Sequence, residues 1–169
     1  MLKTRWNRAI GICVGVVLFA FASASNRDHY MKNRSAQIMR TGSTEELKTY
    51  IETNPGSLEL KSNLDMTPLL NAAYQGNEEG VKLLLKMGAD IRATGLGQQF
   101  NALHCAAVNG NVNVANFLIE GNVEVNARSN KNETPLDVAQ RNRHVQFVAF
   151  LRANGGKGFS ELSVAPAPK

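Results

Sequence analysis

The sequence is poor in several residue types and motifs that mark particular classes of function. Its 169 residues include two cysteines, three histidines and one tryptophan. It contains no P-loop and no G-x-S-x-G, H-E-x-x-H or C-x-x-C motif, so common signatures of nucleotide-binding enzymes, serine hydrolases, zinc proteases and dithiol oxidoreductases are missing. No metal-ligand set has a recognisable spacing. We therefore expect no catalytic activity, no cofactor and no bound metal.

Long apolar stretches are missing as well. The longest, residues 10–21, has 12 residues, whereas a membrane-spanning helix needs about 20. With 43% hydrophobic and 20% charged residues, the composition is close to that of globular proteins, and the length suits one ordinary domain. These figures exclude a polytopic membrane protein, two large domains and a chain that is disordered throughout.

The first 24 residues combine three features of a signal peptide. Basic side chains come first, an uncharged apolar run follows, and the run ends in Ala22-Ser23-Ala24. This order is typical of a secretory leader that is cleaved after its last small residue. We therefore predict a signal peptide at residues 1–24 and a periplasmic or secreted protein, which contacts the membrane only through this segment before cleavage. A segment that is retained as an anchor is the alternative.

Much of the positive charge lies in that segment. The formal net charge is +5, and Lys3, Arg5 and Arg8 contribute three of the positive charges, so cleavage would leave +2. A nearly neutral protein gains little from counterion release on a polyanion. Nucleic acid is therefore not the expected partner.

Cleavage would also remove Cys13 and leave Cys105 as the one remaining cysteine. An intramolecular disulfide would then be impossible, so the fold must depend on apolar packing. Cys105 lies in an alanine-rich stretch, which favours a small buried thiol. A nucleophile or an intermolecular bridge is the alternative.

Three segments of the chain repeat one pattern. They cover residues 67–90, 101–124 and 134–156, and their starts lie 34 and 33 residues apart. Thr-Pro supplies an N-cap and a first helical residue, small residues follow, and Gly76 and Gly110 suit the left-handed turn that ends a helix. In each second helix apolar residues recur at positions i, i+3 and i+4, as in Val81, Leu84 and Leu85. One unit cannot bury this stripe alone, so the units must stack.

The period and the motifs resemble those of the ankyrin-repeat family. Thr67-Pro68-Leu69 and Thr134-Pro135-Leu136 match the start of its repeat, Leu103-His104 continues that start in the middle unit, and Gly88-Ala89-Asp90 matches its end. The resemblance implies an all-α repeat solenoid of about four stacked repeats, each a helix-turn-helix with a β-hairpin loop. We place the domain at residues 25–156, with repeats at approximately 33–60, 65–93, 100–127 and 132–156.

The first of these repeats is degenerate and is interpreted as the N-terminal cap. A capping repeat needs a polar outer side, which Glu45, Lys48 and Glu52 supply. Elsewhere Gly80 replaces an aliphatic residue inside a helix, at a cost of about 1 kcal/mol, and Asn122 stands where a turn glycine is usual. The glycine-rich insert at residues 94–100 predicts a longer and more mobile loop.

The histidines are interpreted as structural. His29 is expected to be solvated. His104 falls on the family's repeat histidine, whose hydrogen bonds join repeats, and His144 is expected to cap the following helix. His104 and Cys105 cannot form a dyad because consecutive helical residues point in different directions.

In ankyrin repeats the hairpin tips and the exposed side of each first helix form the surface on which partners dock. Carried over by position, the predicted partner-binding residues are Arg40, Lys61, Leu64, Met66, Tyr74, Gln75, Gln98, Phe100, Val108, Asn109, Arg128, Lys131 and Arg141. Five of them are apolar where the fold does not require it, which predicts one exposed apolar patch. The alternative is that Leu64 and Phe100 fold back onto neighbouring hairpins.

Residues 157–169 have no periodicity and carry glycine and proline, so a disordered tail is predicted. An extended segment anchored by Phe159 and Leu162 is the alternative.

Together these features predict a monomeric, non-catalytic protein that binds another protein. The expected location favours an inhibitor, immunity or escort protein for a co-exported enzyme, for instance a cell-wall peptidase. A structural assembly scaffold and a secreted effector that binds host proteins are the alternatives.

Overall fold

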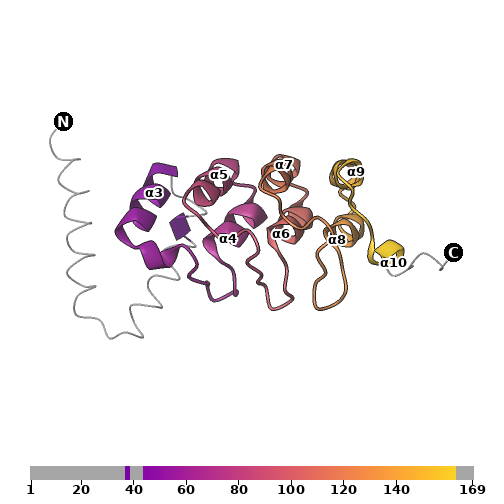
Figure 1. Cartoon of the computed structure of the whole chain (residues 1–169), viewed down its shortest axis with the longest axis horizontal. Helices are drawn as coiled ribbons and strands as arrows, with labels where there is room; N and C mark the ends of the chain where they lie inside the picture. Colours follow the sequence, from indigo (N-terminus) through magenta and orange to yellow (C-terminus); the bar gives the residue numbers. More distant parts are fainter. Residues whose placement is uncertain (1–36, 39–43, 163–169) are drawn as a thin grey trace.

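The computed structural model describes residues 37–38 and 44–162, and this part of the chain is helical. In chain order the elements are α3 (Thr44–Thr53), the 3-10 helix η1 (Pro55–Ser57), α4 (Pro68–Gln75), α5 (Glu78–Lys86), α6 (Ala102–Asn109), α7 (Val112–Glu120), α8 (Pro135–Arg141), α9 (Val145–Ala153) and α10 (Phe159–Leu162). The helix pairs follow one another along a single row (Figure 1). Repeats that follow one another in the sequence are therefore neighbours in the stack.

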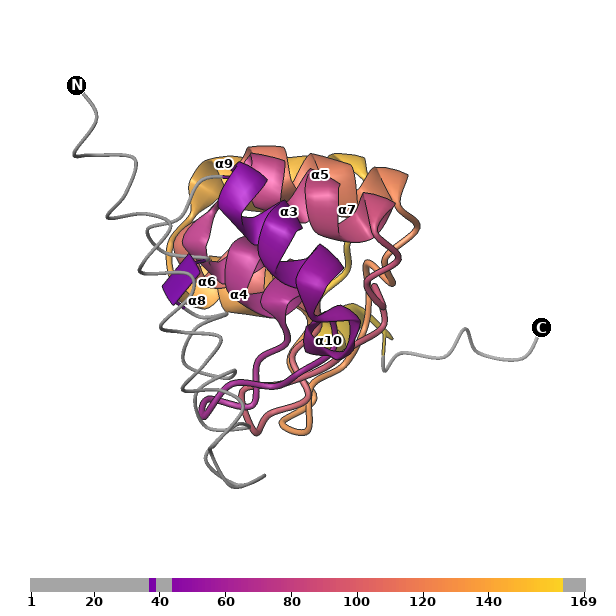
Figure 2. The same ribbon diagram turned by 90° about the vertical axis from the view of Figure 1, so that its left-hand side faces the viewer.

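The row has two layers of helices. The first helices of the pairs, α4, α6 and α8, contact one another in sequence, and the second helices α5, α7 and α9 do the same. Figure 1 shows the second helices above the first ones, with the long loops below. In Figure 2, which looks along the row, these loops project together from one side of the stack. The architecture is the all-α repeat solenoid that the sequence predicts.

The loops differ from the predicted β-hairpins. Within the described residues, the loops contain one strand-like pairing, an isolated antiparallel bridge between Gly95 and Phe100. The other loops hold their shape through turns, such as the Ser62 amide donating to the Met66 carbonyl at 2.8 Å. We call the loops at residues 58–66, 90–100 and 124–133 the first, second and third finger.

The helix boundaries follow from the capping residues. The hydroxyl of Thr67 accepts a hydrogen bond from the Leu70 amide, and Thr134 forms a capping box with Asp137. Gly76 and Gly110, which follow α4 and α6, have φ values of 73° and 71°, the left-handed region that favours glycine. Asn122 has φ 63°, as expected for an asparagine at the turn-glycine position.

The core combines small residues, most of them in the first helices, with large apolar residues from both layers. Ala72 and Ala106 are fully buried between first helices, where the absence of a long side chain permits close approach. Leu84, Leu118 and Phe147 fill the space beside the second helices. At the N-terminal end, α3 buries Leu47 and Ile51 and exposes the polar residues predicted for a cap, Glu45, Lys48 and Glu52.

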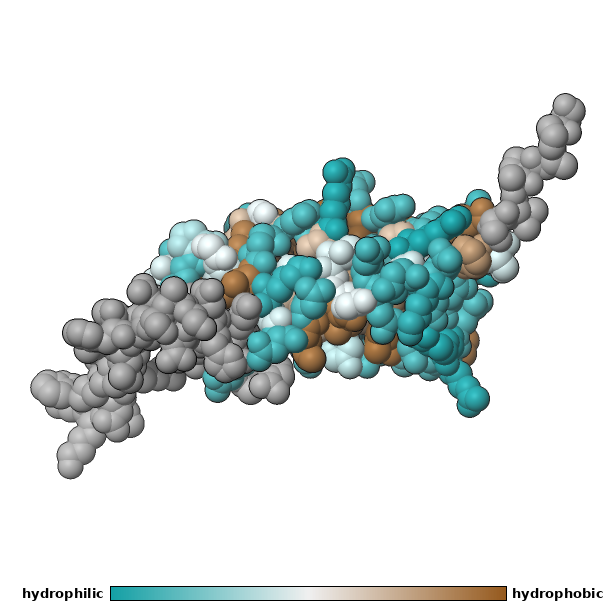
Figure 3. Space-filling view, turned by 90° about the horizontal axis from the view of Figure 1, so that it is seen from below, coloured by the Kyte–Doolittle hydropathy of each residue, from teal (hydrophilic) through white to brown (hydrophobic). Residues whose placement is uncertain are grey.

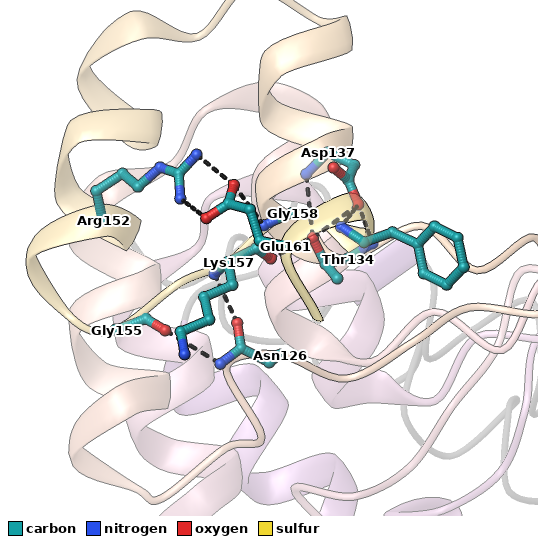
Figure 4. Close-up of polar contacts among 9 residues, drawn as sticks. Asn126, Thr134, Asp137, Arg152, Gly155, Lys157, Gly158 and Glu161 are labelled. Atoms are coloured by element: carbon teal, nitrogen blue, oxygen red, sulfur yellow. Dashed lines mark hydrogen bonds and ion pairs between the residues drawn. The ribbon is translucent and has the colours of Figure 1, made fainter. Parts of the chain in front are cut away.

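The C-terminal segment corrects one prediction. The sequence predicts a disordered tail from residue 157 on, but Phe159–Leu162 forms α10 beside α8. The Asp137 carboxylate accepts a hydrogen bond from the Phe159 amide at 2.9 Å, and Arg152 pairs with Glu161 through its two terminal guanidinium nitrogens (Figure 4). These contacts span up to 22 residues, so periodicity cannot reveal them. Residues 163–169 lie outside the described part.

The predicted signal peptide, residues 25–36 of the predicted domain, His29 and Arg40 also lie outside the described residues. Among the helices that are described, none combines the length and apolar character needed to cross a membrane.

Candidate binding groove

The three fingers are joined to one another. The Leu96 amide approaches the Asp65 carbonyl at 3.4 Å, and the Asn130 amide donates to the Gln98 carbonyl at 3.0 Å. The Asn130 side chain donates to the Gly97 carbonyl at 3.1 Å. The glycine-rich insert therefore forms the middle member of a ladder of loops.

Gly95 is required for this contact. A Cβ atom at this position would lie 2.0 Å from the Asp65 carbonyl oxygen, which is backbone and cannot move aside easily. The sequence pattern shows a glycine-rich insert, but its packing against the preceding finger becomes visible only in the structure.

A groove lies between the fingers and the first helices. Its volume is about 400 Å³, within the range of roughly 300–1,000 Å³ that ligand pockets occupy. Figure 3 views the finger side and shows hydrophobic surface exposed between hydrophilic regions near the middle of the described part. The lining residues are Leu64, Met66, Asn71, Tyr74, Gln75, Leu96, Gln98, Phe100, Val108, Lys131 and Arg141. We refer to this site as the groove.

Most of the predicted partner-binding residues line the groove, but two of them are not exposed. Met66 is 4% exposed and Phe100 is 3% exposed. The ring of Phe100 stacks on the imidazole of His104, with centroids 4.9 Å apart. The prediction of an exposed patch is therefore wrong for these two residues, because the fingers fold back and turn both side chains toward the helices.

Leu64 behaves in the opposite way. Its side chain is 69% exposed, so it does not fold back onto a neighbouring loop. Tyr74 and Val108 are half-buried. The exposed apolar surface is thus smaller than predicted and is formed by Leu64, Tyr74, Val108 and Leu96.

The charged residues that line the groove are both basic. Arg141 pairs with Glu133 of the third finger, and the second carboxylate oxygen of Glu133 is buried without a hydrogen-bond partner. Lys131 is exposed, and no ion pair links it to another residue of the described ranges 37–38 and 44–162. This end of the groove therefore carries an excess of positive charge.

Of the predicted residues that the structure describes, three lie outside the groove lining. Lys61 pairs with Asp65 at 2.9 Å, and this hydrogen bond lowers the pKa of the Asp65 carboxyl below its usual value. The Asn109 side chain donates to the Tyr74 carbonyl at 2.8 Å, which joins α6 to α4. Arg128 lies over the ring of Phe159, 5.2 Å from its centroid.

Asn71 lines the groove and was missed by the sequence reasoning. It lies in the middle of α4 and is 9% exposed. Within the described part of the chain its carboxamide forms no hydrogen bond. The repeat alignment carries the signal that could have found it, because Cys105 and Val138 occupy the equivalent positions of α6 and α8.

His104 is a structural residue with both ring nitrogens engaged. Nε2 lies 3.0 Å from the Glu133 carbonyl, which can only accept, so Nε2 carries the proton. Nδ1 then accepts from the Asn101 amide at 3.3 Å. Burial lowers the pKa of His104 to about 4, so the ring is neutral at neutral pH and joins the second finger to the third.

The side chain of His144 has a different role from the predicted one. It stands before α9, but its side chain does not cap that helix. Its Nε2 instead donates to the Val108 carbonyl at 2.9 Å. Among the equivalent residues, Asn77 does cap its helix, at 2.8 Å from the Gly80 amide. The ring of His144 reaches the preceding repeat because Gly110 leaves room for it.

Cys105 is fully buried, and burial raises the pKa of its thiol to about 12. The thiolate is the reactive form of cysteine, so this residue is poorly suited to nucleophilic chemistry. The described residues also hold no group of three or more His, Cys, Asp or Glu side chains that is arranged to bind a metal ion.

Comparison with known proteins agrees with the helical stack. The family model described as "Ankyrin repeats (many copies)" matches residues 69–119. The I-Kappa-B like protein F1 of Microplitis demolitor bracovirus is 29% identical over 139 residues, which are 78% of this chain and 85% of the viral protein. This chain therefore contains ankyrin repeats. It is therefore a protein-binding module, as ankyrin repeats generally mediate contacts between proteins.

Two other relatives match this chain over a much smaller part of their own length. Palmitoyltransferase ZDHHC17 of Danio rerio is 35% identical over 100 residues, which are 58% of this chain and 16% of the relative. The probable palmitoyltransferase AKR2 of Saccharomyces uvarum is 37% identical over 93 residues, which are 54% of this chain and 13% of the relative. The chain thus spans less than a fifth of these two proteins.

Proposed function

We propose that this ankyrin protein is exported and that it binds a co-exported enzyme through the groove, as an inhibitor, immunity or escort protein. A cell-wall peptidase is one such client. The observation that carries the proposal is the groove itself, a preformed hollow with apolar walls and two basic residues at one end.

The rigid support of the groove favours this use. The fingers are hydrogen-bonded to one another, and His104 joins the second finger to the third. A preformed surface loses little conformational entropy on binding, so more of the contact energy appears as affinity. A protein of this kind can cover the active-site cleft of another protein without chemistry of its own.

The chemistry of the buried residues supports a non-catalytic role. His104 uses both ring nitrogens in hydrogen bonds within the fold, and Cys105 lies in the core with a raised pKa. Neither side chain is available as a general base or nucleophile. Export is supported by the basic, apolar and small-residue segments of residues 1–24.

Affinity capture with two matched variants tests the proposal. Leu64→Asp places a charge at the rim of the groove, and Val145→Asp makes the same kind of change at a residue that is 77% exposed on α9, outside the groove lining. The full chain and the Val145 variant should retain one enzyme from envelope or secreted extracts, and the Leu64 variant should lose it. The activity of the retained enzyme should change when it is bound.

Two results would contradict the proposal. Capture that is equally strong for both variants would place the binding surface elsewhere. A set of weak partners without a common enzyme would favour an assembly scaffold instead.

A further inference from the structure

The carboxamide of Asn71 is an unusual feature of the groove. The residue is nine-tenths buried, its side chain lines the groove, and its amide group has no hydrogen-bond partner within the described ranges. Its amide atoms are not among the fully buried side-chain atoms without a partner in the described residues, which are Ser57 Oγ and Glu133 Oε2, so they remain open to the groove. The equivalent positions of the next two repeats hold the less polar side chains of Cys105 and Val138. A ligand that enters the groove would satisfy Asn71.

A carboxamide matches one ligand group closely. It offers a carbonyl acceptor and an NH₂ donor side by side, which is the complement of a main-chain N–H and C=O pair. A peptide in an extended conformation presents such pairs to a groove and places alternate side chains in its pockets. Asn71 therefore points to the main chain of an extended segment as the ligand.

The surroundings of Asn71 define the side chains of that segment. Tyr74, Leu96 and Val108 form apolar walls in the same groove, and no side-chain hydrogen bond within the described residues engages the Tyr74 hydroxyl. Lys131 and Arg141 lie at the basic end of the groove. The Glu133 carboxylate forms an ion pair with Arg141 and not with Lys131. Opposite charges are complementary across an interface. The segment that binds at this basic end should therefore carry an acidic side chain.

We propose that the groove binds an extended peptide segment of the partner, with a main-chain amide paired to Asn71, an apolar side chain against Tyr74 and Leu96, and a nearby carboxylate facing Lys131 and Arg141. The inference rests on the proposed function only in taking the groove as the binding surface. It does not require that the partner be an enzyme.

Selection from a displayed library of random eight-residue peptides on the full chain tests this inference. The enriched peptides should combine an apolar residue with Asp or Glu a few positions away. One enriched peptide, labelled with a fluorophore, then serves as the probe for affinity measurements by fluorescence polarisation.

Matched variants separate the two contacts. Asn71→Leu should weaken probe binding at least tenfold, whereas Asn116→Leu, at an exposed residue of α7, should change it less than twofold. Lys131→Gln combined with Arg141→Gln should weaken binding at least tenfold and reduce its dependence on salt. Arg143→Gln, which removes one positive charge outside the groove lining, should have little effect. Thermal melting of each variant shows that the fold is retained.

Several outcomes would overturn the inference. Enriched peptides without acidic residues, or with basic ones, would contradict the assigned charge. Unchanged probe affinity in a folded Asn71→Leu variant would contradict the main-chain contact. A library that yields no groove-dependent peptide, while Leu64→Asp still abolishes partner capture, would reject the extended segment and leave the proposed function standing. A dimer of the chain itself that forms through the groove would replace the peptide with a second copy.

Discussion

Phe100→Ala is expected to destabilise the protein severely, although the residue lines the groove. Its ring is 3% exposed and stacks on His104 at 4.9 Å between centroids, with an angle of 14° between the ring planes. Truncation of a buried phenylalanine costs about 3–5 kcal/mol, because transfer energy is lost and a cavity remains. Since His104 joins the second finger to the third, both fingers should loosen.

Leu64→Ala is the matched control on the other side of the groove. Leu64 also lines the groove but is 69% exposed, so its truncation should change the free energy of unfolding by less than about 0.5 kcal/mol. For a domain of this size the Phe100 variant should melt roughly 10–15 °C earlier, and the Leu64 variant within about 2 °C of the unchanged chain.

Urea denaturation followed by circular dichroism measures both effects. The midpoint should fall strongly for Phe100→Ala and hardly for Leu64→Ala. If Phe100→Ala lowers the free energy of unfolding by less than about 1 kcal/mol, the ring is not part of the core. The second finger would then not fold back onto the helices.

Three further results are expected. Cys105, with a pKa of about 12, should react with thiol reagents only as fast as the protein unfolds. Acid should destabilise the protein through His104. The imidazole takes up a proton near pH 6.5 in the unfolded chain and only near pH 4 in the folded one. The free energy of unfolding should therefore decrease as the pH falls through this window, by at most about 3 kcal/mol. Gly110→Ala should cost more than Gly155→Ala, because both have positive φ but only the first brings a Cβ, at 2.8 Å, against the His144 ring.

The opposite results are equally clear. Labelling of Cys105 within seconds in the native protein would contradict its burial. A His104→Gln variant whose stability depends on pH between 6.5 and 4 as strongly as that of the unchanged chain would assign the acid effect to other groups. Equal losses of stability for Gly110→Ala and Gly155→Ala would show that the His144 ring moves aside at little energetic cost. The hydrogen bond from His144 to Val108 would then contribute little to stability.

Helix positions could be predicted from the sequence because each is set by nearby residues. Thr67 and Pro68 open α4, and Gly76 closes it, so all the information lies within ten residues. The stacking order follows from the repeat period alone. The burial of Cys105 follows from its place among small residues.

The finger contacts could not be predicted, because they join residues of different repeats. Phe100 and Met66 are buried by loops that lie against each other, and Gly95 contacts Asp65 from thirty positions away. The position of α10 depends in the same way on Asp137. No local pattern reports such contacts, so the sequence predicts a surface position for the apolar residues at the loop ends.

Asn71 shows a different limit. The alignment of repeats marks it as polar where Cys105 and Val138 are not, but polarity alone fits an asparagine whose amide is satisfied within the fold. Its meaning comes from the combination of burial, a missing partner and a place in the groove. These are properties of the packed structure.

Site-specific photocrosslinking in living cells tests the central claim most directly, because it reports which surface the partner touches. A photoreactive residue at Gln75, which is exposed and lines the groove, should yield one prominent adduct. The same group at Lys86, exposed at the end of α5, should yield none. An adduct at Lys86 without one at Gln75 would contradict the assignment of the groove as the binding surface.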